Sequence, residues 1–420
     1  MSYLSLSSTN PQFSYIVSKN PETIKSTKTP FKRALRQGTV FGWFSPDAQT
    51  FSLYFRDNEV ENSYGNGSFE YLDTSRYEDP RIILGMITES LKSAITNQYE
   101  LDGPGFASSI TFTSRVSSFL RSRAPFNKFT YEPITPDGNY FNITIKGETA
   151  YEVLNLAQAL CILTCVGNES LYLPLDEAGV VKYLKSFAKI EAPYPVWALF
   201  ISRAITSIEL FRKVQEYFTL PGVKFKYGNT QLQRHKAIVE AFDDSKAETL
   251  IDIGCGEMYH TRRLSEKYTQ VIAVEKDTDL NAINERKVER NKLNVLPLNV
   301  EATPAWVESF APTFEGADVL LSEVLEHIDM INAQALLESI LATDANQIVL
   351  TVPNGAFNVN YGMEPDETRH PDHLWEPSPD YLLNTFLNIP LHGRILACEY
   401  VGDDVNGQTP TLLAKFSSKV

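Results

Sequence analysis

The stretch ETLIDIGCGEM, residues 248–258, decides the fold of the C-terminal half of the chain. Its apolar part is typical of a buried β-strand, and the two glycines that follow it predict a tight turn. Such a turn before a helix lets a ligand approach the backbone closely at the N-terminus of the helix. The stretch therefore predicts a nucleotide-type binding site.

Three further apolar strands follow, separated by segments of helix length: VIAVEKD (271–277), ADVLLSE (317–323) and QIVLTVPN (347–354). Ahead of the first strand, NTQLQRHKAIVEAF (229–242) has the apolar spacing of an amphipathic helix. Alternating strands and helices predict an α/β fold with a parallel, doubly wound sheet. Such a sheet binds its ligands at the carboxyl ends of the strands.

The first half of the chain is predicted to be a separate α+β domain. Pro221, Gly222 and Gly228 interrupt the helical pattern, which places the boundary between residues 1–225 and residues 226–420. Period-two alternation predicts strands, and apolar spacing at three and four residues predicts helices. The strands are expected in 39–57, 109–116 and 140–148, and the helices in 81–95, 151–165 and 178–188.

Composition places the chain among globular proteins of a reducing compartment. It is 43% hydrophobic and 21% charged, with no run near the roughly 18 apolar residues that a membrane span needs. The N-terminus lacks the pattern of a signal peptide, and the four cysteines show neither a disulfide framework nor CxxC spacing. These features predict a cytoplasmic protein without a membrane partner.

The net charge of -14 is unevenly distributed. From Ser245 onward there are 13 basic and 27 acidic residues, and no Lys or Arg lies between Lys292 and Arg369. Nucleic-acid binders usually show a basic footprint, so any phosphate contacts must be few or come from elsewhere. Two clusters that interleave aromatic and basic residues, 28–37 and 114–123, are candidates for RNA or partner contact. The alternative is that they are solvated faces.

The glycine turn favours S-adenosylmethionine as ligand. Glu275 ends the next strand, 21 residues after Gly254, where an acidic residue commonly binds ribose hydroxyls. The form Asp252-x-Gly-Cys-Gly resembles motif I of class I S-adenosylmethionine-dependent methyltransferases, although those enzymes often have a small residue where this chain has Met258. A nicotinamide cofactor and a purely structural turn are the alternatives. The predicted cofactor-binding residues are Asp252, Gly254, Gly256, Glu275 and Ser322.

A second candidate site lies in LLSEVLEHID, residues 320–329. Glu323, Glu326 and His327 would point to one place if a helical turn begins there. Similar strings occur in methyltransferases that use no metal, so the stretch alone leaves a metal site, an acid–base site and a solvated helix start open. The loop TRHPDHLWE (368–376) follows a neighbouring strand and brings His373 to the same edge, where two carboxylates and two imidazoles suit Mn²⁺, Fe²⁺, Co²⁺ or Zn²⁺.

The four motifs Asp252-x-Gly-Cys-Gly, Glu323-Val-Leu-Glu-His, Val352-Pro-Asn and Arg369-His-Pro-Asp-His resemble, in this order, the bacterial members of the HUA-enhancer family of RNA 3′-terminal ribose 2′-O-methyltransferases. The resemblance implies one divalent metal ion bound by Glu323, Glu326, His327 and His373. The candidates are Mn²⁺ or Mg²⁺, with Co²⁺ as a further alternative. The resemblance departs at Leu374-Trp375-Glu376-Pro377, where the family usually has Phe-Glu-Trp. It is weaker over the N-terminal half, which in bacterial members supports a polynucleotide kinase–phosphatase–ligase repair enzyme.

The expected activity is methyl transfer to the 2′-hydroxyl of the terminal ribose of an RNA 3′ end with a free 2′,3′-diol. His327 and His370 are the catalytic candidates, with His370 accepting a proton or supporting a ligand, and a surface-loop histidine as the alternative. Two rival interpretations are a metal-independent methyltransferase for a small molecule and a non-enzymatic adaptor for a repair ligase.

Overall fold

The computed structural model describes residues 2–24, 30–36, 38–57, 79–134, 138–364, 367–387 and 394–417. The chain divides into two compact units, Met1–Leu220 and Pro221–Val420. The second unit begins five residues before the predicted boundary. The reason is that the short strand β8, Val223–Lys224, pairs with β15, Asp404–Val405, near the end of the chain.

The first unit contains a seven-stranded antiparallel sheet in the order β2-β3-β4-β1-β5-β7-β6. Its strands are β1 (Tyr3–Ser8), β2 (Phe31–Leu35), β3 (Gly38–Phe44), β4 (Thr50–Asp57), β5 (Ser108–Arg115), β6 (Thr130–Pro133) and β7 (Tyr140–Gly147). Its α-helices are α1 (Phe13–Ile16), α3 (Pro80–Ser90), α4 (Lys92–Thr96), α5 (Ser118–Arg121), α6 (Ala150–Val166), α7 (Glu177–Lys189), α8 (Tyr194–Ala204) and α9 (Ile208–Val214). The predicted α+β architecture is confirmed.

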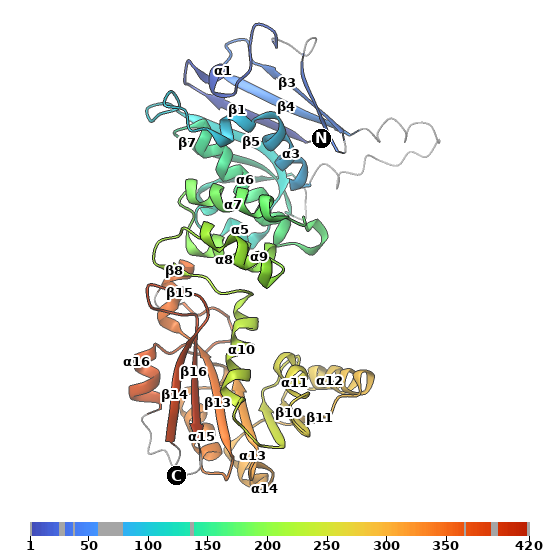
Figure 1. Ribbon diagram of the computed structural model, residues 1–420, viewed down its shortest axis with the longest axis vertical. Coiled ribbons are helices and arrows are strands. Elements are labelled where there is room, and N and C mark those ends of the chain that lie inside the picture. The colour runs from blue at the N-terminus through green and yellow to red at the C-terminus, as the bar shows by residue number, and fades with distance from the viewer. Residues whose placement is uncertain are drawn as a thin grey trace, which may run out of the picture. The chain divides into compact units, whose positions relative to one another are not determined.

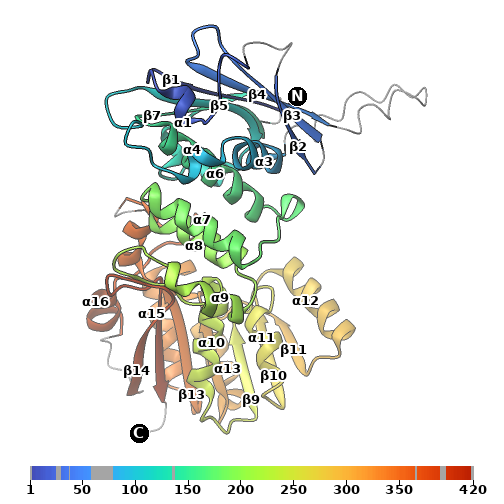
Figure 2. The same ribbon diagram turned by 45° about the horizontal axis from the view of Figure 1, so that its top comes forward.

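Helices cover one face of this sheet (Figure 2). The alternating apolar residues Leu4, Leu53 and Phe112 point to the covered face and are fully buried, and α3 and α6 contact the strands there. Most residues at the intervening positions are half-buried or exposed on the opposite face. The period-two pattern therefore produces one buried face and one face that is open among the described residues.

The second unit is a doubly wound sheet in the order β11-β10-β9-β12-β13-β16-β14, in which β16 runs opposite to the other strands and is antiparallel to both β13 and β14 (Figure 1). Its strands are β9 (Thr249–Ile253), β10 (Gln270–Glu275), β11 (Val295–Asn299), β12 (Asp318–Ser322), β13 (Gln347–Pro353), β14 (Arg394–Val401) and β16 (Thr411–Ser417). Its α-helices are α10 (Thr230–Phe242), α11 (Tyr259–Leu264), α12 (Thr278–Asn291), α13 (Pro304–Ser309), α14 (Ala311–Phe314), α15 (Met330–Leu341) and α16 (Pro379–Tyr381).

Two apolar cores lie on the two faces of this sheet. On one side, residues of α10 and α11 pack on Leu250, Val271 and Leu320, and on the other, residues of α13 and α15 pack on Ile251 and neighbouring strand residues. The predicted α/β class is confirmed, and the carboxyl ends of β9, β12 and β13 meet at one edge. None of the described helices combines the length and the apolar character needed to cross a bilayer.

Candidate functional site

The turn after β9 requires glycine for two physical reasons. Gly254 has φ +68° and Gly256 has φ +52°, in the left-handed region that favours glycine. A Cβ on Gly254 would also lie 2.6 Å from Cγ2 of Val324, closer than van der Waals contact allows. The turn thus brings the end of β9 directly against the segment that follows β12.

Met258 completes this turn in a conformation that L-residues rarely adopt. It has φ +59° and ψ +38° immediately before α11, and its side chain is fully buried in the core beside Leu264 and Val271. A left-handed conformation costs a non-glycine residue about 1–2 kcal/mol, which burial of the thioether offsets here. Met258 therefore stands in place of a small residue because its side chain fills the core beneath the glycine turn.

Replacing Met258 tests this balance. Met258→Gly and Met258→Ala both remove the buried side chain, but only glycine relieves the left-handed strain. We expect Met258→Gly to be the more stable by about 1 kcal/mol, the reverse of their order in a helix interior. Urea denaturation of the two variants measures the difference. A more stable alanine variant would show that Met258 is not strained.

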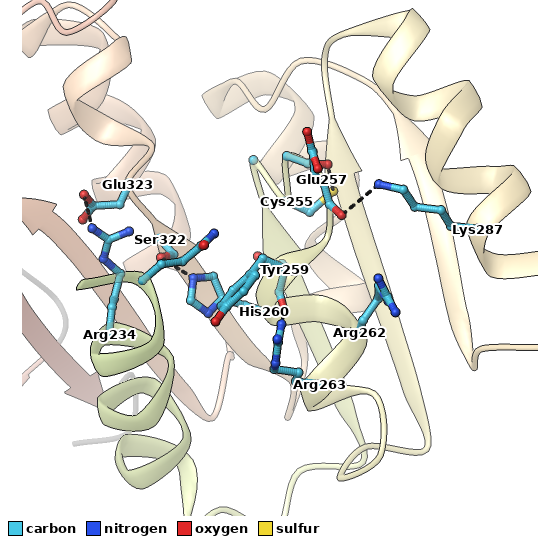
Figure 3. A pocket seen from close by; sticks show the side chains of 14 residues that line it. Arg234, Cys255, Glu257, Tyr259, His260, Arg262, Arg263, Lys287, Ser322 and Glu323 are labelled. Atoms are coloured by element: carbon cyan, nitrogen blue, oxygen red, sulfur yellow. Dashed lines mark hydrogen bonds and ion pairs between the residues drawn. The ribbon is translucent and has the colours of Figure 1, made fainter. Parts of the chain in front are cut away.

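A cavity of about 630 Å³ opens above the glycine turn (Figure 3). Of the predicted cofactor-binding residues, Asp252, Gly254, Gly256 and Ser322 line it. Glu275 is not among the lining residues. It ends β10 and accepts hydrogen bonds of 3.0 Å from the backbone amides of Gly256 and Asp277, so its carboxylate stabilises the turn.

Asp252 supports the cavity from below. Its carboxylate is buried and accepts a 2.6 Å hydrogen bond from the hydroxyl of Thr261 in α11. Burial raises the pKa of Asp252 to about 7, with the Thr261 bond opposing this shift and the Glu275 charge adding to it. Asp252 thus fixes the start of α11 relative to β9.

The sequence did not single out Arg234 and His260, which also line the cavity. In Figure 3 the Arg234 guanidinium points to Glu323, with 2.7 Å between Nη2 and Oε2. Nε2 of His260 lies 3.4 Å from the hydroxyl of Ser322. Burial first, and then the positive charge of Arg234, lower the pKa of His260 to about 3, so this ring is neutral at physiological pH.

The cavity is more basic than the linear charge pattern predicted. Arg262, Arg263 and Lys287 reach it from α11 and α12, and the tract without Lys or Arg contributes only Ser322 and Glu323. Whether a basic side chain reaches the cavity therefore depends on which face of each helix packs against the sheet. A count of charges along the sequence does not reveal this.

Beyond Glu323, three predicted metal ligands converge. One ligand atom each of Glu326, His327 and His373 lies within 4.8 Å of the others. The Glu326 side chain is fully buried, and neither carboxylate oxygen has a hydrogen-bond partner among the described residues. Burial and then the Glu323 charge raise the pKa of Glu326 well above its usual range. An uncompensated buried carboxylate beside two imidazoles fits a bound cation.

The two imidazoles are oriented by their Nδ1 atoms. His327 Nδ1 donates to the backbone carbonyl of Asp372 at 3.1 Å, and His373 Nδ1 donates to the carboxylate of Glu376 at 2.5 Å. Hydrogen bonds of this kind fix the tautomer and leave Nε2 for a ligand. Burial and the neighbouring His373 lower the pKa of His327, which favours the neutral form that coordinates metals.

Glu376 remains ionised despite its burial. Burial alone would raise its pKa, but hydrogen bonds from Asn358, His373 and the Arg369 backbone, together with the Arg369 charge, lower it overall. It therefore presents a negative charge to His373. The sequence marked Glu376 only as a departure from a family pattern and did not predict this contact.

Glu323 and His370 lie beside the three-residue group rather than in it. Glu323 has φ +56°, and its carboxylate is held by Arg234 and by a 3.1 Å bond from Thr351. The helical turn after it is a short 3₁₀ segment, Leu325–His327, so the three side chains of the predicted spacing do not all converge. His370 is exposed, with its ring centre 5.6 Å from that of His373.

The sheet order and the glycine turn define the fold of a class I S-adenosylmethionine-dependent methyltransferase. The model of the Hen1 N-terminal domain family matches residues 3–220, more than half of the chain. The chain therefore belongs to the Hen1 family, and the predicted resemblance to the HUA-enhancer family is confirmed.

The chain is also similar to a curated relative, and it shares its fold with solved structures. A small RNA 2′-O-methyltransferase of Caenorhabditis elegans is 30% identical over 197 residues, 41% of this chain and 45% of the relative, so the chain spans less than half of that relative's length. A chain of the Pnkp1/Rnl/Hen1 RNA repair complex matches 99% of this chain and 100% of its own, with a TM-score of 0.74 and 23% identity. A second structure of the complex gives 0.72 at 23% identity, covering 99% of each chain.

Proposed function

We propose that the chain transfers the methyl group of S-adenosylmethionine to the 2′-hydroxyl of the 3′-terminal ribose of RNA, in RNA repair or end protection. The observation that carries this proposal is the buried Glu326 carboxylate, which lacks a partner and faces His327 and His373. The activity named for the nematode relative supports the same chemistry.

The three converging residues are the metal ligands that we propose. One carboxylate and two imidazoles suit first-row transition-metal ions such as Mn²⁺ and Co²⁺, whereas Mg²⁺ prefers oxygen ligands and is the weaker candidate. A bound ion would supply contacts for the 2′- and 3′-hydroxyls and lower the pKa of the 2′-hydroxyl. Glu323, the fourth predicted ligand, is held by Arg234 and would have to leave that ion pair to join the set.

The protein's own groups position the donor and receive the proton. The cavity lined by Gly254, Gly256 and Ser322 holds S-adenosylmethionine, and Glu275 keeps the turn in shape. Transfer breaks the carbon–sulfur bond, whose electrons stay on sulfur, and forms the bond from carbon to the 2′-oxygen. The proton of the 2′-hydroxyl passes to His370, which is exposed beside His373. His327 helps to hold the terminal ribose of the RNA in place.

Selectivity for the RNA end tests the proposal. The full chain is incubated with labelled S-adenosylmethionine, Mn²⁺ and short RNAs that end in a 2′,3′-diol, a 3′-phosphate or a 2′-deoxyribose. We expect label only on the diol RNA, because the other two ends each lack one of the two hydroxyls. Methylation of the 3′-phosphate RNA, or full activity in EDTA, would instead support a metal-independent enzyme.

We further propose that the first unit binds an RNA repair ligase. The Hen1 N-terminal domain model matches this unit, and the whole chain has the fold of a chain in the Pnkp1/Rnl/Hen1 complex. Adding the full chain to such a ligase should raise the rate at which it seals nicked RNA. An unchanged rate, together with separate elution of the two proteins on gel filtration, would refute this partner.

A further inference from the structure

The open face of the first unit's sheet carries a row of aromatic side chains. Residues directly opposite each other across β2, β3, β4 and β1 are Lys32, Phe41, Tyr54 and Tyr3. Tyr3 is 37% exposed, Phe41 and Tyr54 are half-buried, and the Lys32 ammonium lies 5.7 Å from the centre of the Phe41 ring. Trp43 adds a fourth ring two positions along β3.

Small hydroxyl side chains occupy several other positions on this face. Ser7 bonds to Thr50 at 2.9 Å, Thr111 bonds to Thr144 at 3.0 Å, and the Tyr3 hydroxyl bonds to Ser52 at 3.0 Å. These groups satisfy one another across the strands. The rings therefore stand beside a low, polar surface rather than in a closed apolar core.

The face is also basic. Lys146 on β7 and Lys32 on β2 are exposed toward its two sides, and Arg56 and Arg115 lie on the same face. Among the described strand residues of this face, Glu132 on the edge strand β6 is the acidic one, and it accepts a hydrogen bond from Asn142. Stacking rings flanked by positive charges complement single-stranded nucleic acid, whose bases offer π faces and whose backbone is anionic.

The two basic clusters of the sequence behave differently. Residues 30–36 of the first cluster are described, and Lys32 is on the open face whereas Arg33 points to the covered face and pairs with Glu89 at 2.7 Å. In the second cluster, Arg121 lies 4.4 Å from the centre of the Phe141 ring and Arg123 lies 4.3 Å from that of Phe119. The first cluster therefore contributes Lys32 to the open face, whereas the second contributes Arg115, and its Arg121 and Arg123 lie against aromatic rings.

We propose that this open face, defined by Tyr3, Phe41, Trp43, Tyr54, Lys32 and Lys146, binds single-stranded RNA. The choice of RNA as ligand rests on the proposed function. The acidic methyltransferase unit has few cations for phosphates, so a second RNA-binding surface supplies the affinity that a diol-recognising site lacks. Base stacking makes the binding independent of sequence.

Binding of the full chain to a 5′-fluorescein-labelled 12-nucleotide RNA tests this proposal. The RNA ends in a 3′-phosphate, so that the proposed diol site does not contribute, and anisotropy is measured over a range of salt concentrations. We expect Phe41→Ala/Tyr54→Ala to weaken binding at least about tenfold with an unchanged salt dependence. Lys32→Ala and Lys146→Ala should each weaken binding and reduce the slope of log K against log salt by about 0.7.

The matched control is Lys92→Ala, an exposed lysine on α4 of the covered face, which should bind as the unaltered chain does. Thermal unfolding shows whether each variant is folded. If the double aromatic variant does not fold, the two lysine variants alone test the proposal. Unchanged affinity in the folded variants would overturn the proposal, as would loss of ligase binding without loss of RNA binding. Methyl transfer to a diol RNA is scored separately, so the proposed function can fail or stand on its own.

Discussion

Replacing Glu326 by glutamine is expected to abolish methyl transfer, by about 10³-fold or more. The variant keeps the shape of the side chain but loses the carboxylate that faces His327 and His373. Loss of a metal ligand removes several kcal/mol of charge stabilisation at the 2′-oxygen. Cofactor binding should survive, because the cavity around Gly254 is lined by other residues. Labelled-methyl transfer and calorimetric titration with S-adenosylmethionine measure the two effects.

The same substitution should change stability in opposite directions with and without metal. Because burial raises the pKa of Glu326, its charge destabilises the metal-free protein. This loss of stability is absent below the ordinary carboxyl pKa of about 4.3 and is complete above the raised pKa of the folded protein. At pH 7.5 in EDTA, Glu326→Gln should therefore unfold at a higher temperature than the unaltered chain. At 100 times the Kd for Mn²⁺ the order should reverse, since binding adds about 2.7 kcal/mol.

Glu338→Gln, on the exposed side of α15, is the matched control and should leave both activity and unfolding unchanged. A Glu326→Gln protein that still transfers methyl groups at the normal rate would remove the metal from the mechanism. A variant that also fails to bind S-adenosylmethionine would indicate misfolding rather than a lost ligand.

Replacing Glu376 by glutamine should weaken metal binding about 10–100-fold without destroying the site. Its carboxylate accepts the hydrogen bond from His373 Nδ1 and makes the ring a stronger ligand through Nε2. Because the three ligands remain, a higher Mn²⁺ concentration should restore kcat. The measurement is methyl transfer as a function of Mn²⁺, compared with Glu364→Gln, an exposed carboxylate before the same loop.

Rescue by metal distinguishes a positioning role from a structural one. If Glu376 only packs the loop, the variant should lose stability and stay inactive at every Mn²⁺ concentration. An unchanged Mn²⁺ requirement would show that His373 does not depend on this carboxylate.

Local patterns predicted most of the fold because the elements are strongly periodic. The buried strands β10, β12 and β13 follow directly from their apolar runs, and the turn after β9 follows from its two glycines. Breaks inside a pattern were harder to predict. The helix expected over 81–95 divides into α3 and α4 at Leu91, whose φ of −120° ends the helical conformation without a glycine or proline to mark it.

The candidate site was predictable where topology alone brings residues together. His373 lies 46 residues after His327, yet both follow neighbouring parallel strands and so reach the same edge. The Arg234–Glu323 ion pair spans 89 residues and depends on the rotation of α10 against the sheet. The left-handed backbone of Glu323, whose carboxylate pairs with Arg234, has no signal in the amino-acid pattern.

The location of a bound ion tests the central claim most directly. Crystals grown with Mn²⁺ and measured at an X-ray energy just above the manganese absorption edge would show the ion as an anomalous peak. The predicted peak lies at coordination distance from the Glu326 carboxylate and from Nε2 of His327 and His373. Saturating Mn²⁺ without a peak there, or a peak held by other residues, would contradict the proposed metal centre.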